Sequence, residues 1–188
     1  MKTISDYKPG DIIVKKHNGI FPEAIQFEMK WDAEKNLKIK WPYDWFGNHV
    51  MIVVKYEGKL QILDASKEGS GIKDTLERYI NDPTCRHYRF KDLFDEIELN
   101  ILINQLVTEY GEITKPYDKW GLVCQSVYIH SGRRFWIGLK GEKSRNKPYC
   151  SELAAIWINK VYPGVFGART YKQNINDIEL CEVLTIVK

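Results

Sequence analysis

Two apolar runs joined by a short turn, in the stretch NHVMIVVKYEGKLQILDAS (residues 48–66), constrain the fold more than any other feature. The runs are rich in Val, Ile, Leu and Met, and they flank YEGK, in which Gly58 can adopt the positive φ of a tight hairpin turn. Both runs are apolar at successive positions, which is typical of strands covered on both faces. The stretch therefore predicts two central strands, with other elements packed on each side of their sheet.

The remaining elements follow from shorter patterns of apolar periodicity and turn residues. Strands come first and helices later, with a strand at the end, which favours an α+β fold: a central antiparallel sheet or partial barrel with helices packed on it. The predicted long helix buries Phe94, Ile97, Ile101, Leu102 and Leu106. We expect further strands near residues 11–15, in TCRHYRF and in ELCEVLTIVK, and helices in FPEAIQFEMK, GIKDTLERYIND, DLFDEIELNILINQLVTEYGEI, YDKWGLVCQSVYIH and from Cys150 to the YPG stop.

The sequence predicts a single domain with one candidate insertion. The 188 residues show no break in composition, so we expect one domain over residues 1–188. Residues 31–47 form a polar span, rich in Lys and Asp, that stands directly before His49 and predicts an insertion or flap over a pocket. The aromatic residues at its end are Trp41, Tyr43, Trp45 and Phe46.

Charge and hydropathy limit the partners. Twenty-eight Lys and Arg against 25 Asp and Glu give a net charge of +3, too small to imply nucleic acid or an anionic membrane. The N-terminal MKTISDYKPGDIIV has charged residues before any apolar core, and no 18-residue apolar run follows. We expect a cytoplasmic protein, unless a leader was trimmed, with no stable membrane insertion; the oligomeric state stays open.

The cysteines and histidines lack metal-binding spacing. Without a secretory signal, the four cysteines are read as free thiols, and none is spaced as CxxC. The histidines, His17, His49, His87 and His130, likewise show no zinc pattern, so we expect no metal and no other cofactor. Among the thiols, Cys124 lies mid-run in GLVCQSV, Cys181 lies in the predicted closing strand, and Cys85 lies on a predicted edge strand.

Cys150 has the most reactive setting, because it stands where NKPYC passes into the helix-favouring run SELAAIWINK. Leu153 and Trp157 follow at i+3 and i+7, so the thiol shares the stripe that faces the sheet. Unpaired N–H groups and the positive end of the helix dipole stabilise a thiolate there. Cys150 is thus a candidate nucleophile and its N–H a candidate oxyanion donor, although a lone cysteine on an apolar face is more often a small core residue.

A histidine and an acid can be placed beside this thiol by counting along the hairpin. If the YEGK turn has two central residues, Tyr56 pairs with Lys59 and His49 falls opposite Ser66. Asp64 then shares the face of His49. A three-residue loop would turn Asp64 away, unless a bulge restored the parity. Under the first register, His49 can take the thiol proton while Asp64 orients the ring.

The order of several motifs resembles a known family. GDIIV, AIQF, NHVMIVV, ILDAS, KPYD and YCSELAAIW, in this order, are similar to the circularly permuted NlpC-type cysteine hydrolases, the YiiX-like branch of the papain-like superfamily. The similarity spans nearly the whole chain, and its most specific part is a strand-start histidine followed by an acid-Ala pair and YCSEL. It implies a permuted papain-like fold and hydrolysis of amide, ester or thioester bonds. It also implies Cys150 as nucleophile, His49 as base and Asp64, where the family commonly has Glu, as the orienting acid.

We therefore expect a cysteine hydrolase that forms an acyl-enzyme on Cys150. Its substrate would be a small peptide, an amino-acid derivative or a lipid acyl compound, cleaved at an amide (peptide or N-acyl amine) or ester bond. Tyr117, Tyr149 and Trp45 are candidates for the substrate-binding wall, although aromatic residues there are as readily core. The alternative is a non-catalytic binding module of the same fold, holding an amino acid, peptide or lipid beside a vestigial triad.

Overall fold

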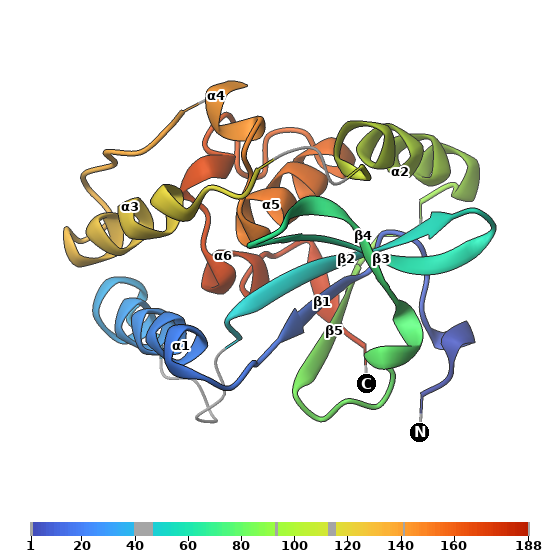
Figure 1. The fold of residues 1–188 in the computed structure, drawn as a ribbon, viewed down its shortest axis with the longest axis horizontal. Coiled ribbons are helices and arrows are strands. Elements are labelled where there is room, and N and C mark those ends of the chain that lie inside the picture. Colours follow the sequence, from blue (N-terminus) through green and yellow to red (C-terminus); the bar gives the residue numbers. More distant parts are fainter. Residues whose placement is uncertain (1, 40–46, 93, 113–115, 141, 188) are drawn as a thin grey trace.

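The fold is mixed α+β, as predicted, with helices packed on an open sheet (Figure 1). The computed structural model describes residues 2–39, 47–92, 94–112, 116–140 and 142–187. Within this part of the chain the sheet has six strands in the order β4-β3-β2-β1-β5-β6, and each pairing is antiparallel. The strands are β1 (Ile12–Lys15), β2 (His49–Tyr56), β3 (Lys59–Ser66), β4 (Gly69–Thr75), β5 (Cys85–Phe90) and β6 (Leu184–Ile186).

Helices fill the second half of the chain, and one precedes the hairpin. Figure 1 shows α3, α5 and α2 across the upper part of the view, with α1 beside α3. Among the described residues, none of the helices combines the length and apolar character needed to cross a bilayer. The helices are α1 (Ile20–Asp32), α2 (Glu96–Tyr110), α3 (Lys119–His130), α4 (Glu142–Arg145), α5 (Cys150–Val161) and α6 (Ile175–Glu179), with a π-helix at Ala33–Leu37 and 3₁₀ turns at Ile4–Asp6, Leu76–Arg78 and Thr170–Lys172.

The β2–β3 hairpin has the two-residue turn that its sequence favours. Glu57 and Gly58 adopt φ values of 50° and 78°, and Tyr56 pairs with Lys59. This left-handed backbone matches the twist of antiparallel strands and suits glycine at the second position. The register places Ile52 opposite Leu63, where the β2–β3 ladder ends.

Both faces of β2 are covered, as the unbroken apolar run predicts. Val50, Ile52 and Val54 lie in the main core with α5, whereas Met51 and Val53 lie in a second cluster on the other face. Helix α5 is buried along most of its length because its small and apolar residues pack directly on β2 and β3. Burying each large apolar side chain of this kind contributes about 1.5–3 kcal/mol.

Trp157 fixes α5 at the end remote from Cys150. Its ring is fully buried, and its Nε1 donates a 2.9 Å hydrogen bond to the carbonyl oxygen of Gly10, just before β1. A buried indole N–H needs such an acceptor. The helix that carries the candidate nucleophile is therefore tied to the first strand of the sheet.

Three assignments made from the sequence were wrong. The segment GIKDTLERYIND contains the second half of β4 and a 3₁₀ turn rather than a helix, because the tight turn before Gly69 returns the chain alongside β3, with Asp64 opposite Gly71. Strand β5 is not an edge strand, since it lies between β1 and β6. Cys181 precedes β6 instead of lying within it.

The long helix α2 is where the sequence predicts it, but its buried face differs. Leu106 is buried as predicted, but Ile97 and Ile101 are 72% and 52% exposed, and Ile103 and Tyr110 are buried instead. Apolar residues occur around much of this helix, so periodicity alone could not choose the face that packs on the sheet.

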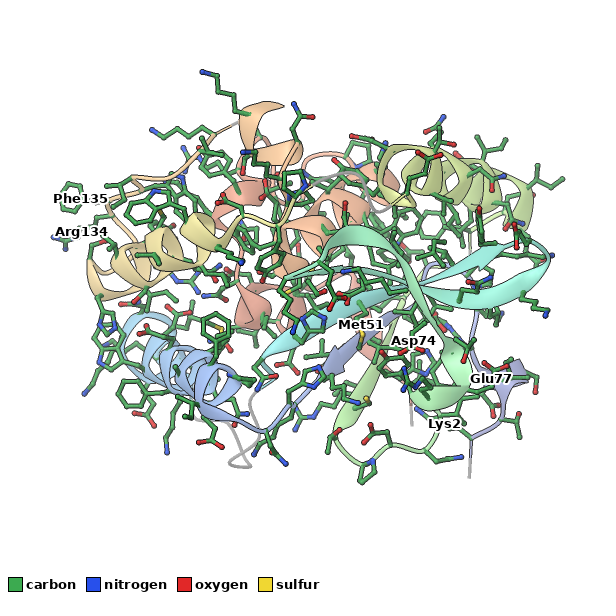
Figure 2. All side chains as sticks on the ribbon, viewed as in Figure 1. Lys2, Met51, Asp74, Glu77, Arg134 and Phe135 are labelled. Carbon is green, nitrogen blue, oxygen red and sulfur yellow. The ribbon has the colours of Figure 1, made fainter. Side chains whose placement is uncertain are left out.

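The first part of the predicted flap, residues 31–47, is structural. Helix α1 continues to Asp32, the π-helix follows, and Asp32 and Ala33 are fully buried. The Asp32 carboxylate accepts hydrogen bonds from Arg133, including one of 2.9 Å from its Nε, and from Asn36 and Asn174. The next residue, Arg134, points away from the protein instead, at the left edge of Figure 2. The aromatic residues Trp41, Tyr43, Trp45 and Phe46 lie outside the described residues.

Candidate active site

His49 and Asp64 meet at the end of the hairpin ladder. The Nε2 atom of His49 lies 2.7 Å from Oδ1 of Asp64, and the two side chains are 15% and 13% exposed. The two-residue turn thus gives the parity that brings the imidazole and the carboxylate to one face. The pair is polar and nearly enclosed at the edge of an apolar core.

Cys150 approaches the same imidazole from α5. It is the first residue of that helix and only 4% exposed, and its side chain lies close enough to His49 and Tyr117 to raise the pKa of each. Because Nε2 of His49 is engaged by Asp64, Nδ1 is the nitrogen left to face the thiol. His49 lies on the same face of β2 as Met51, because side chains two residues apart share a face. Helix α5 packs on the other face, so the thiol meets the imidazole at the start of β2, beyond the last pair of the β2–β3 ladder.

The electrostatics favour a charged pair. Burial lowers the pKa of His49, but the Asp64 carboxylate and the Cys150 side chain outweigh it and raise that pKa to about 10. Burial raises the pKa of Asp64, and the imidazole of His49 more than reverses the change and holds it below its usual range. Near neutral pH the site therefore carries an imidazolium facing a carboxylate.

The ring nitrogens of His49 should report this state directly. We expect His49 to stay protonated at pH 8, because its pKa in the folded protein lies above the ordinary 6.5. The stabilisation from the pair is complete below pH 6.5 and is lost as the pH rises toward 10. Ring ¹⁵N chemical shifts measure the midpoint, which Asp64→Asn should move down, while Glu28→Gln, which removes the carboxylate beside His130, should not move it. A midpoint near 6.5 in the unaltered protein would contradict the assignment.

A cleft of about 600 Å³ opens beside the pair. One wall comes from the start of α1 and is apolar, with Phe21, Pro22 and Ile25. His49 and Tyr117, which both contact Cys150, line the cleft, so the thiol is reached past these two side chains. The other lining residues are His17, Asn18, Asn48, Met51, Asp64, Ser66, Lys67 and Tyr79.

The three predicted binding residues have different outcomes. Tyr117 lines the cleft. Tyr149 does not: it is fully buried with Cys124 and Trp136, and its hydroxyl donates to the carbonyl oxygen of Tyr171. As the N-cap residue of α5 it is turned toward α3 rather than toward the thiol, so this assignment was wrong. Trp45 lies outside the described residues.

Sequence reasoning missed His17 and Phe21. The ring centroid of His17 lies 5.5 Å from that of His49, and Phe21, 62% exposed, stands at the start of α1. No sequence signal marks His17, because its place beside His49 depends on the pairing of Lys15 with His49, which brings the chain that leaves β1 past the start of β2.

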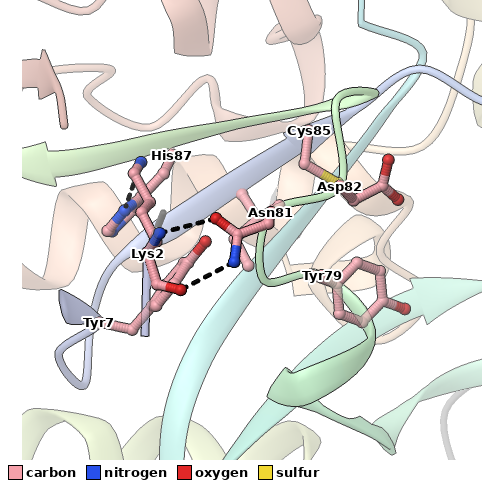
Figure 3. A pocket seen from close by; sticks show the side chains of 8 residues that line it. Lys2, Tyr7, Tyr79, Asn81, Asp82, Cys85 and His87 are labelled. Atoms are coloured by element: carbon pink, nitrogen blue, oxygen red, sulfur yellow. Dashed lines mark hydrogen bonds between the residues drawn. The ribbon is translucent and has the colours of Figure 1, made fainter. Parts of the chain in front are cut away.

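A second thiol-containing cavity, of about 240 Å³, is shown in Figure 3. In it Lys2 contacts His87, whose Nε2 lies 2.6 Å from the buried Asp11 carboxylate. Burial and the nearby Asp82 raise the pKa of Cys85 to about 12, so its thiol is protonated at neutral pH. Burial also raises the pKa of Cys124 and of Cys181. These three thiols are poor nucleophiles.

The chemistry available to the site is that of a thiol, an imidazole and a carboxylate in a row. Within the described ranges, no group of three or more His, Cys, Asp and Glu residues is arranged to hold a metal ion. The row of three groups can move a proton from Cys150 to His49 while Asp64 holds the ring.

Comparisons with known proteins show a likeness at the level of fold. No family model matches the chain, and no curated protein matches it. Among solved structures, the crystal structure of the metalloprotein yiiX from Escherichia coli O157:H7, described as DUF1105, is similar with a TM-score of 0.56 and 17% sequence identity over 96% of each chain. At this identity the likeness concerns the backbone arrangement alone. The chain therefore has a YiiX-like fold: an open antiparallel sheet with helices packed on it.

Proposed function

We propose that the protein is a cysteine hydrolase of the papain-like kind, with Cys150 as nucleophile, His49 as acid and base, and Asp64 as the orienting group. One observation carries the proposal: a single imidazole contacts both the Asp64 carboxylate, at 2.7 Å, and the thiol at the first turn of α5. The histidine strand precedes the cysteine helix, which agrees with the circularly permuted NlpC-type enzymes that the sequence resembles.

The reaction would run through an acyl-enzyme. The thiolate of Cys150 attacks the carbonyl carbon of the substrate, and the imidazolium of His49 gives its proton to the leaving amine or alcohol. A water molecule then attacks the thioester carbonyl and passes a proton to His49. The C–S bond breaks, a carboxylic acid leaves, and the thiolate and imidazolium are restored.

The first turn of α5, which carries Cys150, can also stabilise the oxyanion. The N–H of a first helical residue has no acceptor within the helix, and the helix dipole is positive there. The N–H of Cys150 is thus free to donate to the developing oxyanion. The Tyr117 hydroxyl, already in contact with the thiol, is placed to be a second donor.

The cleft supports a small substrate with an apolar acyl part. Its volume is within the range of sites for small organic ligands, and its lining combines the apolar residues of α1 with Lys67. These features fit a small peptide, an amino-acid derivative or a lipid acyl compound, cleaved at an amide or ester bond. A metal ion bound to His49 would have to displace Asp64 or the thiol from the imidazole, so we expect hydrolysis to survive a chelator.

Selective alkylation tests the nucleophile. Limited iodoacetamide near neutral pH should modify Cys150 before the other cysteines, because only that thiol contacts an imidazole at a helix start. Peptide mass mapping measures the order in which the cysteines are modified. His49→Ala should slow the labelling of Cys150 without changing that of Cys85, which serves as the internal control.

Two results would count against the proposal. If Cys85 or Cys124 reacts ahead of Cys150 in the folded protein, the nucleophile is misassigned. If Cys150 reacts no faster than a free thiol, the protein is the alternative, a non-catalytic binding module of the same fold. A panel of acyl electrophiles with varied chain and head group would then define what the cleft accepts.

A further inference from the structure

The backbone of His17 is held rigidly beside the catalytic histidine. Its N–H donates to Oδ1 of Asn48 at 2.8 Å, and Nδ2 of Asn48 donates back to the carbonyl oxygen of His17 at 2.8 Å. Asn48 is 3% exposed and directly precedes His49. Gln26 Nε2 donates a further bond of 3.0 Å to the same carbonyl. Three hydrogen bonds thus fix the backbone of an exposed loop residue relative to the start of β2.

The His17 ring enters the cleft next to the His49 ring. The ring centroids are 5.5 Å apart and the planes are inclined by 60°. Both residues line the 600 Å³ cleft. In the described part of the chain, no protein group is hydrogen-bonded to a ring nitrogen of His17, so its donor and acceptor are available to a molecule in the cleft that it lines.

The charges around His17 keep its ring neutral. Burial lowers the pKa of His17, and the positive charges on His49 and Lys15 lower it further. Asp64 and Asp82 act in the opposite direction without reversing the change. A neutral imidazole keeps one nitrogen with a free lone pair, whereas a protonated ring would offer donors only.

We propose that His17 is a second catalytic histidine that holds the hydrolytic water during deacylation; the inference rests on the function proposed above. Once the leaving group has taken its proton from His49, a water molecule gives one hydrogen to Nδ1 of His49. A water in such a site needs two to four polar partners, and the neutral nitrogen of His17 accepts its other hydrogen.

His17 has the same protonation state before and after this step. The water oxygen forms a bond to the thioester carbonyl carbon, its proton passes to His49, and the C–S bond breaks to release the acid and the Cys150 thiolate. His17 only orients the attacking oxygen, which lowers the entropic part of the barrier. Its loss should therefore slow deacylation more than acylation, provided that the leaving group needs no assistance.

A p-nitrophenyl acyl ester meets that condition, and intact-protein mass after rapid quenching separates the two steps. In His17→Ala we expect the acyl adduct on Cys150 to form at the unaltered rate and to decay about tenfold more slowly, as for the loss of one hydrogen bond. Hydroxylamine, which attacks the adduct without needing a bound water, should restore much of the turnover. His17→Gln, which keeps an acceptor, should fall in between.

The control is His130→Ala, which removes an exposed histidine outside the cleft and should change neither rate. If the His17→Ala adduct decays at the unaltered rate, or if formation and decay slow together, the inference is wrong while the acyl-enzyme stands. If the unaltered protein forms no Cys150 adduct at all, the proposed function fails, and this inference with it. The rate of Cys150 alkylation in His17→Ala should stay unchanged, which shows that the thiol site is intact.

Discussion

Cys150→Ala should abolish hydrolysis, His49→Ala should lower kcat by about 10²–10⁴, and Asp64→Asn should do the least damage. Without the thiol no acyl-enzyme can form. Without the imidazole the thiol loses its proton acceptor and the leaving group loses its acid. An amide at position 64 can still accept from the ring N–H at the observed 2.7 Å, but it cannot stabilise the imidazolium as a carboxylate does.

The decisive result is the order of the three losses of activity. Rates are compared on any acyl substrate that the protein hydrolyses, with the fold checked by circular dichroism. Glu68→Gln is the matched control, because it neutralises an exposed carboxylate in the turn after β3. An Asp64→Asn enzyme with full activity would remove Asp64 from the mechanism and leave a thiol–imidazole pair.

Arg133→Ala should cost about 3–5 kcal/mol of unfolding free energy, a large part of the ~5–15 kcal/mol typical of a domain. The Asp32 carboxylate is fully buried, and Arg133 is its only charged hydrogen-bonding partner among the described residues. Arg133 also binds Asp177 at 2.7 Å, so it joins α1 to α6. Its removal leaves a buried negative charge that only the neutral amides of Asn36, Asn174 and Asn176 contact among the described residues.

The neighbouring position provides the control for this loss. Arg134 points away from the protein, and Arg134→Ala should change the unfolding free energy by no more than about 0.5 kcal/mol. Urea titration followed by tryptophan fluorescence measures both variants. Equal midpoints for Arg133→Ala and Arg134→Ala would show that the buried carboxylate is satisfied without the guanidinium.

The parts of the structure that the sequence predicts well are those set by local rules. The turn residues Glu57 and Gly58 define the hairpin register, and the register alone brings His49 and Asp64 together. The Pro-Tyr approach and the apolar run likewise place Cys150 at a helix start. Each of these inferences depends only on residues a few positions apart or on the pairing of two adjacent strands.

The parts that were missed depend on distant contacts. Tyr149 looks like a pocket residue in the sequence, but the carbonyl of Tyr171 draws its hydroxyl into the core. Asp32 reads as part of a polar flap until Arg133 supplies its partner. The position of His17 depends on Asn48, which precedes the neighbouring strand β2 and is 31 residues away along the chain. No periodicity or turn signal encodes these partners.

The two halves of the candidate site have very different separations along the chain. His49 and Asp64 are 15 residues apart on one hairpin, so contacts close in sequence assemble them early at a small loop-closure cost. Cys150 joins them only when α5 has docked on β2, which requires the last quarter of the polypeptide. Under the proposed function, the thiol therefore lacks its imidazole partner during synthesis, and it becomes a nucleophile only in the finished fold.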